Sequence, residues 1–593
     1  MTSPDADALY ARSHQLWTEG HRAEALAAAD AALALRPDFA EAHYNRGVML
    51  QAMNRQQEAL AAYDSALALK PALVPAWNNR GIALGALGRY GEAAANYDRL
   101  LALAPANASA HYNRGAALQQ LGQWEEAAAE FTQTLGLNPR HPDAFGCLAS
   151  AALHVCDFAR AAALAPALAE TVRRGNAVVA PLALLGFSGD PALQLRCAEN
   201  FIAATIPRVA GLPPRPATPR ERIRIAYLSS DFQDHATAYL AAELFERHDR
   251  GRFEVTGFSF GPGDDGAMRA RIAKAFDAFH DIAAMSDEAA AKLLRTLEVD
   301  IAIDLKGHTQ GARPAILSHR PCPVQAAYLG YPGTMGCDFI DYVIADEIVA
   351  PSGHAAFFSE KIVHLPGCYQ VNDSKRPHPS SPPRRELGLP EQGLVFCSFN
   401  NNWKIAAPVW DVWMRLLTAV PGSVLWLLAD NDAARRNLCL AAEARGVVSS
   451  RLVFAPRLPL ADHLARHGAA DLFLDTAPCN AHTTASDALW MGLPLVTLLG
   501  ASFSGRVAAS LLNAVGLPEL VTESLADYEA LALALARDPA QLAALRARVE
   551  AARATAPLFD AGRFCRGLEA AYVAMWETAL AGAPPRGFSV PPG

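Results

Sequence analysis

The stretch AEAHYNRGVMLQAMNRQQEALAAYDSALALKPAL, from Ala40 to Leu73, decides how the first quarter of the chain folds. The next 34 residues, VPAWNNRGIALGALGRYGEAAANYDRLLALAPAN from Val74 to Asn107, align with it without a gap. Residues 108–141 form a further copy in register, and residues 6–39 a weaker first copy. A proline ends every copy, at Pro37, Pro71, Pro105 and Pro139. Because proline stops a helix, this spacing predicts a series of helix–turn–helix units.

A period of 34 residues is the tetratricopeptide pattern. One helix pair cannot bury its apolar face alone, whereas stacked pairs share a core and leave a concave groove suited to an extended peptide. Asn45, Asn79 and Asn113 occupy one repeat position, each within the tripeptide Asn-Arg-Gly. Because an amide both donates and accepts hydrogen bonds, such a column could hold the backbone of a peptide. The alternative is that these asparagines only bridge adjacent repeats.

The rest of the chain divides by its change of pattern. Residues 142–219 are expected to form a degenerate helical cap and a proline-rich linker. After the linker, short β-rich runs alternate with helical segments, which predicts parallel sheets with helices on both faces. A proline-rich break around 377–383 separates a first lobe, residues 220–385, from a second lobe with a closing helix, residues 386–580. Residues 581–593 are expected to be a flexible tail.

Ten buried strands are expected in the two lobes. The first series is Ile223 to Leu228, Phe253 to Phe260, Asp300 to Leu305, Val324 to Leu329 and Tyr342 to Ala345. The second series is Leu394 to Phe399, Ser423 to Leu428, Leu452 to Phe454, Leu472 to Asp475 and Leu495 to Leu498.

Composition excludes several classes of protein. A chain of 593 residues with 51% hydrophobic and 19% charged residues is expected to be globular, with several domains. The net charge of −8 argues against nucleic-acid binding. The ten cysteines form no Cys-x-x-Cys pair, as expected of reduced thiols. Neither a signal peptide nor a membrane-spanning run is evident, so we expect a cytoplasmic protein without a membrane partner.

The clearest chemical signal is the run from Cys479 to Asp487, which follows a predicted strand and leads into a helix. Thr483 and Thr484 lie where hydroxyls and free backbone N–H groups would bind a phosphate, and Asp487 could accept hydrogen bonds from a ribose. The alternative makes Thr483 a helix cap and His482 a packing residue. After another predicted strand, Lys404 could neutralise a diphosphate leaving group, although most isolated lysines are solvated surface charges.

The first lobe has similar signals after its strands. In the run from Ser229 to Thr237, His235 could bind a sugar or assist proton transfer. The segments 306–311 and 329–334 are loops of small residues, where backbone can approach a ligand closely. In the second lobe, His463 and Arg466 form a possible pair facing a base and a phosphate.

Together these motifs resemble the catalytic domain of O-GlcNAc transferase and its plant relative SPINDLY, over about Ala6 to Thr578. The resemblance is most specific in segments 329–334, 423–428, 480–487 and 506–510. It implies an α-solenoid followed by an α/β GT-B fold with two Rossmann-like lobes. It also implies a UDP-sugar donor, a protein acceptor held through the asparagine column, and a reaction that uses neither a metal nor another cofactor.

The resemblance further assigns roles to individual residues. Lys404 and His235 would be catalytic, with Lys404 on the diphosphate and His235 beside the sugar and acceptor. The donor-binding residues would be Asn401, His463, Arg466, His482, Thr483, Thr484 and Asp487. The loops at the sugar and acceptor would contribute Thr237, His308, Thr309, Gly330, Pro332, Gly333 and Thr334. The general base is left open between His235 and a phosphate oxygen of the donor.

Some residues depart from the family pattern. His235-Ala236-Thr237 stands between the animal His-Pro-Thr and the SPINDLY His-Ser-Val, while Leu460 replaces a lysine and Ala501 a glutamate. We predict an inverting transfer of GlcNAc from UDP-GlcNAc to serine or threonine of a protein. The alternatives are another donor, GDP-fucose or a nonulosonic acid used on flagellin, or a repeat scaffold with an inactive transferase domain.

Two metal-like patterns are discounted. Asp430-Asn431-Asp432 resembles an Asp-x-Asp metal site, but it falls in a polar turn where these residues are common. His463 and His467 are four residues apart without the glutamate of His-Glu-x-x-His, so no zinc site is expected.

Overall fold

The computed structural model describes residues 5–428 and 430–592. The chain separates into two compact units, Met1–Ala152 and Leu153–Gly593. In the first unit, every predicted repeat is a pair of helices. These are α1 (Ala6–Thr18) with α2 (Arg22–Leu35), α3 (Ala40–Ala52) with α4 (Gln56–Leu69), α5 (Val74–Ala86) with α6 (Tyr90–Leu103), and α7 (Ala108–Gln120) with α8 (Trp124–Leu137). The predicted tetratricopeptide solenoid is therefore confirmed.

The glycine of each Asn-Arg-Gly tripeptide lets the two helices of a repeat approach closely. A Cβ atom on Gly47 would lie 2.5 Å from the ring of Tyr63, and one on Gly81 would lie 2.4 Å from the ring of Tyr97. Both rings are buried in the repeat core. The 34-residue period of glycine is thus a packing requirement, since any side chain would displace an aromatic ring.

The turn between the paired helices continues the period beyond the last predicted repeat. Gly88 and Gly122 close their turns in the left-handed region, with φ of 72° and 74°. Cys156, 34 residues after Gly122, does the same with φ of 53° between α9 (Ala144–His154) and α10 (Phe158–Arg174). The segment expected to be a degenerate cap therefore begins with two helices that are joined by the same kind of turn. It continues with α11 (Pro181–Leu184) and α12 (Pro191–Thr205), and residues 207–220 contain no helix or strand.

The first lobe contains an eight-stranded parallel sheet in the order β14-β7-β6-β5-β4-β1-β2-β3. Its strands are β1 (Ile223–Ser229), β2 (Phe253–Ser259), β3 (Ala278–Asp281), β4 (Ile301–Asp304), β5 (Val324–Ala327), β6 (Tyr342–Ala345), β7 (Lys361–His364) and β14 (Phe588–Ser589). The intervening helices are α13 (Ala236–Arg247), α14 (Ala267–Ala275), α15 (Asp287–Thr296) and α16 (Ala315–Ser318). β1 and β4 to β6 are almost wholly buried, which explains why their sequences are mostly apolar.

The second lobe contains a six-stranded parallel sheet in the order β10-β9-β8-β11-β12-β13. Its strands are β8 (Val395–Ser398), β9 (Val424–Leu428), β10 (Leu452–Ala455), β11 (Leu472–Leu474), β12 (Leu495–Leu498) and β13 (Val521–Thr522). Its helices are α17 (Ala407–Ala419), α18 (Asp432–Glu443), α19 (Leu460–Arg466), α20 (Thr483–Trp490), α21 (Val507–Ala514), α22 (Leu525–Arg537) and α23 (Pro539–Thr555). Both sheets follow the Rossmann strand order, so the predicted pair of Rossmann-like lobes is confirmed.

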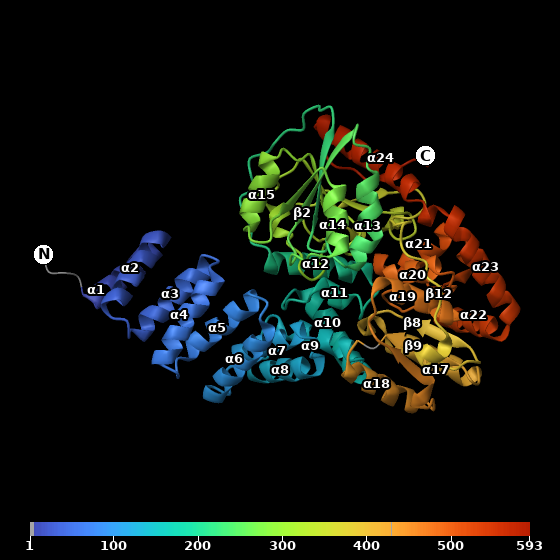
Figure 1. The fold of residues 1–593 in the computed structure, drawn as a ribbon, viewed down its shortest axis with the longest axis horizontal. Helices are drawn as coiled ribbons and strands as arrows, with labels where there is room; N and C mark the ends of the chain where they lie inside the picture. Colours follow the sequence, from blue (N-terminus) through green and yellow to red (C-terminus); the bar gives the residue numbers. More distant parts are fainter. Residues whose placement is uncertain (1–4, 429, 593) are drawn as a thin grey trace. The chain divides into compact units, whose positions relative to one another are not determined.

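The last helix, α24 (Ala561–Leu580), returns from the second lobe and packs beside α13 of the first lobe (Figure 1). The hydroxyl of Tyr572 on α24 lies 2.9 Å from that of Tyr227 on β1. The expectation of a flexible tail at residues 581–593 needs correction, because Phe588–Ser589 pairs with β7 and extends the first sheet. A segment this short has too few residues for a strand pattern to be read from its sequence.

Within the described ranges, no helix is both long and apolar enough to cross a membrane.

Candidate functional site

The strand order of each sheet reverses between two neighbouring strands. In the first lobe these are β1 and β4, and in the second lobe β8 and β11. Ligands of such sheets bind beyond the carboxyl ends of the strands at this reversal. His235 follows β1, His308 follows β4, Lys404 follows β8, and Thr483 follows β11. Four predicted site residues from separate parts of the sequence therefore lie at the two reversal points.

Lys404 ends a short 3-10 helix, Asn402–Lys404, that directly follows β8. Its ammonium donates to the backbone oxygen of Asn480 at 2.6 Å, and the side chain is half-buried. The loop is held by Asp430, whose Oδ2 accepts from the backbone N–H of Asn402 at 2.9 Å. Because Asn480 lies just before α20, this contact sets the ammonium beside the N-terminus of that helix.

The first turn of α20 is left uncapped. His482 precedes the helix, but its side chain makes no capping hydrogen bond; its Nε2 lies 3.2 Å from the backbone oxygen of Ser504. Burial, then the charge of Lys404, holds the pKa of His482 well below its usual value, so the ring is neutral. Free N–H groups at a helix N-terminus attract anions, and the Lys404 ammonium adds a full positive charge. This corner is suited to a phosphate group.

The polar side chains behind the corner hold one another in place. Thr484 donates its hydroxyl to Asn400 Oδ1, and Asn400 Nδ2 donates to the hydroxyl of Thr476 at 2.9 Å. Asp475 accepts from the backbone N–H of Thr476 and of Ala481, and burial raises its pKa to about 6. The run from Asn480 to Thr484 is thus fixed by buried hydrogen bonds, as a preorganised binding loop requires.

Asp487 is buried and paired with a residue that the sequence did not point to. Its Oδ1 accepts from Arg376 Nη1 at 2.8 Å, and its Oδ2 lies 3.4 Å from His463 Nε2. Burial opposes ionisation of Asp487, but the hydrogen bond from His463 and the charge of Arg376 hold its pKa below the usual value. Arg376 is 111 residues away in the connector between the lobes, so only the fold brings the two together.

His463 lies on α19 and faces Asp487, while Arg466 lies behind it. Arg466 is only 1% exposed and packs with its guanidinium 4.1 Å above the ring of Phe399. It donates to the backbone oxygen of Pro456 at 2.8 Å and contacts His463 Nδ1. The expectation that Arg466 faces a phosphate is therefore not what the structure shows, because burial leaves it supporting His463 instead. Asn401 is exposed, and its Oδ1 accepts from Arg457 at 2.9 Å.

In the first lobe, His235 is the N-cap of α13. Its Nδ1 accepts from the backbone N–H of Thr237 at 3.2 Å. Asp231, in the same loop, lies with Oδ2 at 3.4 Å from that nitrogen and accepts from the ammonium of Lys306 at 2.7 Å. Lys306 belongs to the loop after β4, so a buried ion pair joins the two strands of the reversal point.

The loops after β4 and β5 pack tightly on each other. A Cβ atom on Gly330 would lie 1.9 Å from the backbone oxygen of Leu305, and one on Gly307 would lie 2.4 Å from Tyr331. Thr309 donates its hydroxyl to the backbone oxygen of Lys306 at 2.8 Å. These small residues are thus needed where one loop crosses the other.

Several residues expected at the sugar and acceptor loops are buried in structural contacts. Pro332 and Gly333 are buried, and Thr334 donates its hydroxyl to buried Glu360 at 2.7 Å. The Nε2 atom of His308 lies 3.0 Å from the backbone oxygen of Met335, and burial lowers the pKa of His308 to about 4. These contacts shape the loop and leave few of its side chains exposed.

The two lobes meet at these loops. Tyr331, from the loop after β5, shares one buried apolar cluster with Trp403, which precedes Lys404, and with Cys479, which precedes Asn480. The first-lobe loops therefore contact the loops that carry the anion corner.

The asparagine column of the repeats forms contacts between neighbouring repeats. Asn79 Nδ2 donates to the hydroxyl of Tyr44 at 3.3 Å, and Asn113 Nδ2 donates to Asn78 Oδ1 at 3.3 Å. Asn45 contacts the hydroxyl of Tyr10, and each asparagine is half-buried. The bridging alternative is therefore seen in the structure, while the acceptor role stays a prediction.

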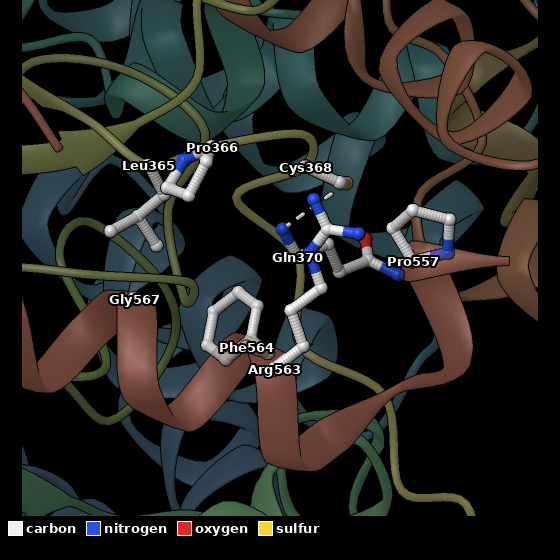
Figure 2. Close-up of a pocket in the computed structure, with 8 residues that line it drawn as sticks. All are labelled: Leu365, Pro366, Cys368, Gln370, Pro557, Arg563, Phe564 and Gly567. Carbon is white, nitrogen blue, oxygen red and sulfur yellow. Dashed lines mark hydrogen bonds between the residues drawn. The ribbon is translucent and has the colours of Figure 1, made fainter. Parts of the chain in front are cut away.

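A separate pocket lies between the loop after β7 and the start of α24 (Figure 2). It is lined by Cys368, Gln370, Arg563 and Phe564 among others, none of which was a predicted site residue. The cavity measures about 20 Å³, room for about one or two water molecules. Buried Gln370 Nε2, without a hydrogen-bond partner among the described residues, is a natural partner for such a water.

One group of potential metal ligands occurs among the described residues: His248, Cys565 and Glu569. His248 Nδ1 lies 3.0 Å from Glu569 Oε1, so hydrogen bonding accounts for the group. Asp430, from the discounted Asp-x-Asp pattern, is held by Arg457 at 2.6 Å and by the backbone of Asn402. The carboxylate of Asp430 thus accepts hydrogen bonds that hold the Lys404 loop.

Comparison with known proteins agrees with this architecture. The family model described as glycosyl transferase family 41 matches residues 211–381 and 379–568, and tetratricopeptide models match residues 10–73, 83–122 and 108–141. A solved mutant of the O-GlcNAc transferase of Thermobaculum terrenum has 29% sequence identity and a TM-score of 0.69, covering 92% of this chain and 98% of that chain.

Two curated relatives are longer than this chain. The probable UDP-N-acetylglucosamine–peptide N-acetylglucosaminyltransferase SEC of Arabidopsis thaliana is 38% identical over 430 residues, 70% of this chain and 44% of that protein. The UDP-N-acetylglucosamine–peptide N-acetylglucosaminyltransferase of Caenorhabditis elegans is 28% identical over 61% of this chain and 41% of that protein. The matched part thus spans less than half the length of these relatives.

Proposed function

This chain belongs to glycosyl transferase family 41, and from that premise we propose that it transfers a sugar from a nucleotide-sugar donor to serine or threonine hydroxyls of a protein. The hydroxyl attacks the anomeric carbon as the nucleoside diphosphate leaves, so the configuration inverts. This assignment agrees with the names of relatives that use UDP-N-acetylglucosamine on peptides.

The corner formed by Lys404 and the N-terminus of α20 is the main observation that supports the proposal. The Lys404 ammonium contacts the backbone oxygen of Asn480 at 2.6 Å, next to the uncapped first turn with Thr483 and Thr484. A departing diphosphate gains negative charge, so a fixed ammonium and helix N-terminus stabilise it more than they stabilise the bound donor. No proton transfer or metal ion is needed for that effect, and we propose that the reaction proceeds without a metal or another cofactor.

We assign the second lobe to the nucleotide. Asp487 is held ionised between Arg376 and His463, at the first helix after the phosphate corner. An ionised carboxylate there is suited to accept hydrogen bonds from the ribose hydroxyls. UDP-GlcNAc is the donor that we favour, because relatives named for it align over most of the chain.

We assign the acceptor to the repeat groove. Asn45, Asn79 and Asn113 recur at one position, and an incoming peptide could replace their present hydrogen bonds to neighbouring repeats. The ten free cysteines fit a reducing compartment, and we place the reaction in the cytoplasm.

The alternative of an inactive scaffold predicts an eroded site. Instead, Lys404, Asp487 and His235 each have specific buried partners: Asn480, Arg376 and the Asp231–Lys306 pair. Buried polar contacts of this kind have a cost in stability, and a scaffold without activity would not need to maintain them.

The test is a donor panel with the full chain. UDP, GDP and CMP are titrated by calorimetry, and UDP-GlcNAc, GDP-fucose and a CMP-nonulosonic acid are then incubated with a lysate from cells lacking the gene. Mass spectrometry should find N-acetylhexosamine on serine or threonine with UDP-GlcNAc alone. Fucose or nonulosonic acid on peptides would replace the donor assignment, and an absence of both binding and transfer would support the scaffold.

A further inference from the structure

We propose that Lys306 is a positioning residue that fixes the proton of His235 on Nε2, the ring nitrogen from which it can be donated to an oxygen of the bound substrates. The inference rests on the proposed function, because it gives His235 a part in sugar transfer. It depends on three side chains from two loops: His235 and Asp231 after β1, and Lys306 after β4.

The backbone of α13 already determines the protonation of one ring nitrogen of His235, Nδ1. Nδ1 accepts the N–H of Thr237 at 3.2 Å, so it cannot carry a proton in the neutral ring. The proton of the neutral imidazole is therefore on Nε2. Among the described residues, Nε2 has no hydrogen-bond partner, and 44% of the side chain is exposed. This nitrogen is available to a ligand as a donor.

Asp231 competes with the N–H of Thr237 for Nδ1, because its carboxylate favours a proton on that nitrogen. Its Oδ2 lies 3.4 Å from His235 Nδ1. A carboxylate free to accept at this distance draws a proton onto the facing nitrogen, as it does in carboxylate–histidine pairs. The neutral ring would then carry its proton on Nδ1, the N–H of Thr237 would lose its acceptor, and Nε2 would become an acceptor.

Lys306 engages the same oxygen atom that faces His235. Its ammonium donates to Asp231 Oδ2 at 2.7 Å, while Ser230 donates its hydroxyl to Oδ1 at 3.0 Å. The side chains of Lys306 and Asp231 are 3% and 9% exposed, so solvent screens their pairing little. Both oxygens of the carboxylate are thus occupied, and Asp231 has little remaining attraction for a proton on His235.

The loop after β4 fixes Lys306 itself. Asp304 accepts from the backbone N–H of Lys306 at 2.9 Å and of Gly307 at 3.0 Å, so its carboxylate faces the backbone. The charged groups that act on His235 are then Asp231 and Lys306. Burial lowers the pKa of His235, Asp231 raises it, and Lys306 lowers it. The charge of Lys306 therefore acts in the same direction as its hydrogen bond.

This assignment predicts an unusual pH behaviour. With Lys306 present, His235 donates from Nε2 both as the neutral ring and as the imidazolium, so its titration does not remove the donor. In Lys306→Met, the neutral ring carries its proton on Nδ1, and the Nε2 donor is lost as pH rises through the His235 pKa. The variant should lose turnover by at least about tenfold on the alkaline side, where the parent does not.

The direct test is nitrogen NMR of the full chain labelled with ¹⁵N-histidine, without donor or acceptor. His235 is assigned by its missing signals in His235→Asn. The chemical shifts should report a protonated Nε2 in the parent from acid to mildly alkaline pH. Lys306→Met should show its midpoint at higher pH and, above that midpoint, a proton on Nδ1.

A double variant separates this role from a structural one. Lys306→Met leaves Asp231 buried without its partner and could destabilise the fold, whereas Lys306→Met with Asp231→Asn removes both charges. The double variant should restore the proton to Nε2 and abolish the alkaline loss of turnover. Unchanged shifts in the single variant, or failure of the double variant to reverse them, would overturn the proposal. A parent that transfers no sugar would contradict the proposed function alone, since the NMR result needs no substrate.

Discussion

Two positive features meet beside the end of β8: the Lys404 ammonium and the uncapped first turn of α20. Their separate origins in the sequence mean that Lys404 can be removed while the helix stays. Lys404→Ala should reduce turnover by about 10²–10³, the usual cost of one electrostatic donor at a developing charge. Melting should change little, since the lysine is only half-buried and its removal leaves no core cavity.

Kinetics and thermal melting on the same preparation check this expectation. Exposed Lys292→Ala is the matched control, because that lysine pairs with Glu288 on the surface of α15. Near-normal turnover of Lys404→Ala would exclude Lys404 from the mechanism, and a large drop in melting temperature would point to a structural role.

His308 gives a pH prediction of known sign. Burial lowers its pKa to about 4, whereas a histidine of the unfolded chain titrates near 6.5. Between these two pKa values the unfolded state binds more protons than the folded state. The stabilisation that comes from holding His308 neutral is therefore complete above about pH 6.5, and it is lost as pH falls towards 4. This loss amounts to about 3 kcal/mol for an ideal two-state unfolding.

Urea denaturation at several pH values should therefore show a shallower acid loss of stability in His308→Asn than in the parent. Exposed His21→Asn serves as the control, with the parent slope. Equal slopes for the parent and His308→Asn would show that His308 is not held neutral by the fold.

For each interacting pair in the site, one of the two residues could be predicted from the sequence. Lys404, Asp487 and His235 stand in runs of unusual polar residues after predicted strands, so local pattern and family resemblance both point to them. Their partners carry no such signal. Arg376 stands just before the proline-rich break at 377–383, and pairing it with Asp487 requires the fold of both lobes. Arg466 shows the reverse case, since a motif placed it in the site and burial placed it behind His463.

At the level of elements, the repeat glycines offer the sharpest prediction. Gly81 and Gly85 both lie on α5, but a Cβ atom on Gly81 would lie 2.4 Å from Tyr97, whereas one on Gly85 would meet no atom within 4 Å beyond its chain neighbours and the backbone of its own helix. Gly81→Ala should destabilise the repeats by about 1–3 kcal/mol through overpacking. Gly85→Ala should be neutral or stabilising by up to about 1 kcal/mol, since alanine favours a helix.

Calorimetric melting of the full chain, with UDP titration as a second measurement, tests this pair. The repeat transition should move down in Gly81→Ala alone, and nucleotide affinity should be unchanged in both variants. Equal melting of the two variants would mean that the Tyr97 ring moves aside at little cost.

The sequences of the individual strands show why most of the fold could be predicted. Buried parallel strands such as β6 and β9 are unbroken apolar runs, and every predicted strand is present. The strands that were missed lie towards the sheet edges or are very short. β3 is Ala278–Asp281 with no fully buried residue, and β14 is only Phe588–Ser589. Their pairing depends on neighbouring strands and not on a local pattern.

At the scale of the whole molecule, we expect the proposed reaction to need no metal. In the proposal, Lys404 and α20 would supply the positive charge that a divalent cation supplies in Asp-x-Asp enzymes, while Asp430 accepts hydrogen bonds from Arg457 and Asn402. Transfer should persist in excess EDTA, measured by release of the nucleoside diphosphate. A tenfold loss that Mg²⁺ or Mn²⁺ restores would contradict this and return attention to Asp430 and Asp432.

The repeats are expected to couple to the reaction by holding the protein acceptor. Replacing Asn45, Asn79 and Asn113 together by Ala removes hydrogen bonds to the neighbouring repeats, and also any hydrogen bonds to an acceptor backbone. If the column binds the acceptor, transfer to an intact protein should fall strongly, since each lost hydrogen bond costs roughly 0.5–1.5 kcal/mol. UDP affinity measured by calorimetry should stay at the parent value.

A second triple variant separates binding from bridging, because each asparagine has a partner in the preceding repeat. Tyr10→Phe, Tyr44→Phe and Asn78→Ala remove one bridging hydrogen bond of each asparagine, and leave in place the asparagines and the contact of Asn45 with His14. Both triple variants should lower the melting temperature of the repeats to a similar extent. Only the asparagine variant should lose transfer to the protein acceptor, because only it lacks the amides that hold a peptide backbone. Equal loss of transfer in the two variants would show that the column acts through repeat stability. Unchanged transfer in both would remove it from acceptor recognition.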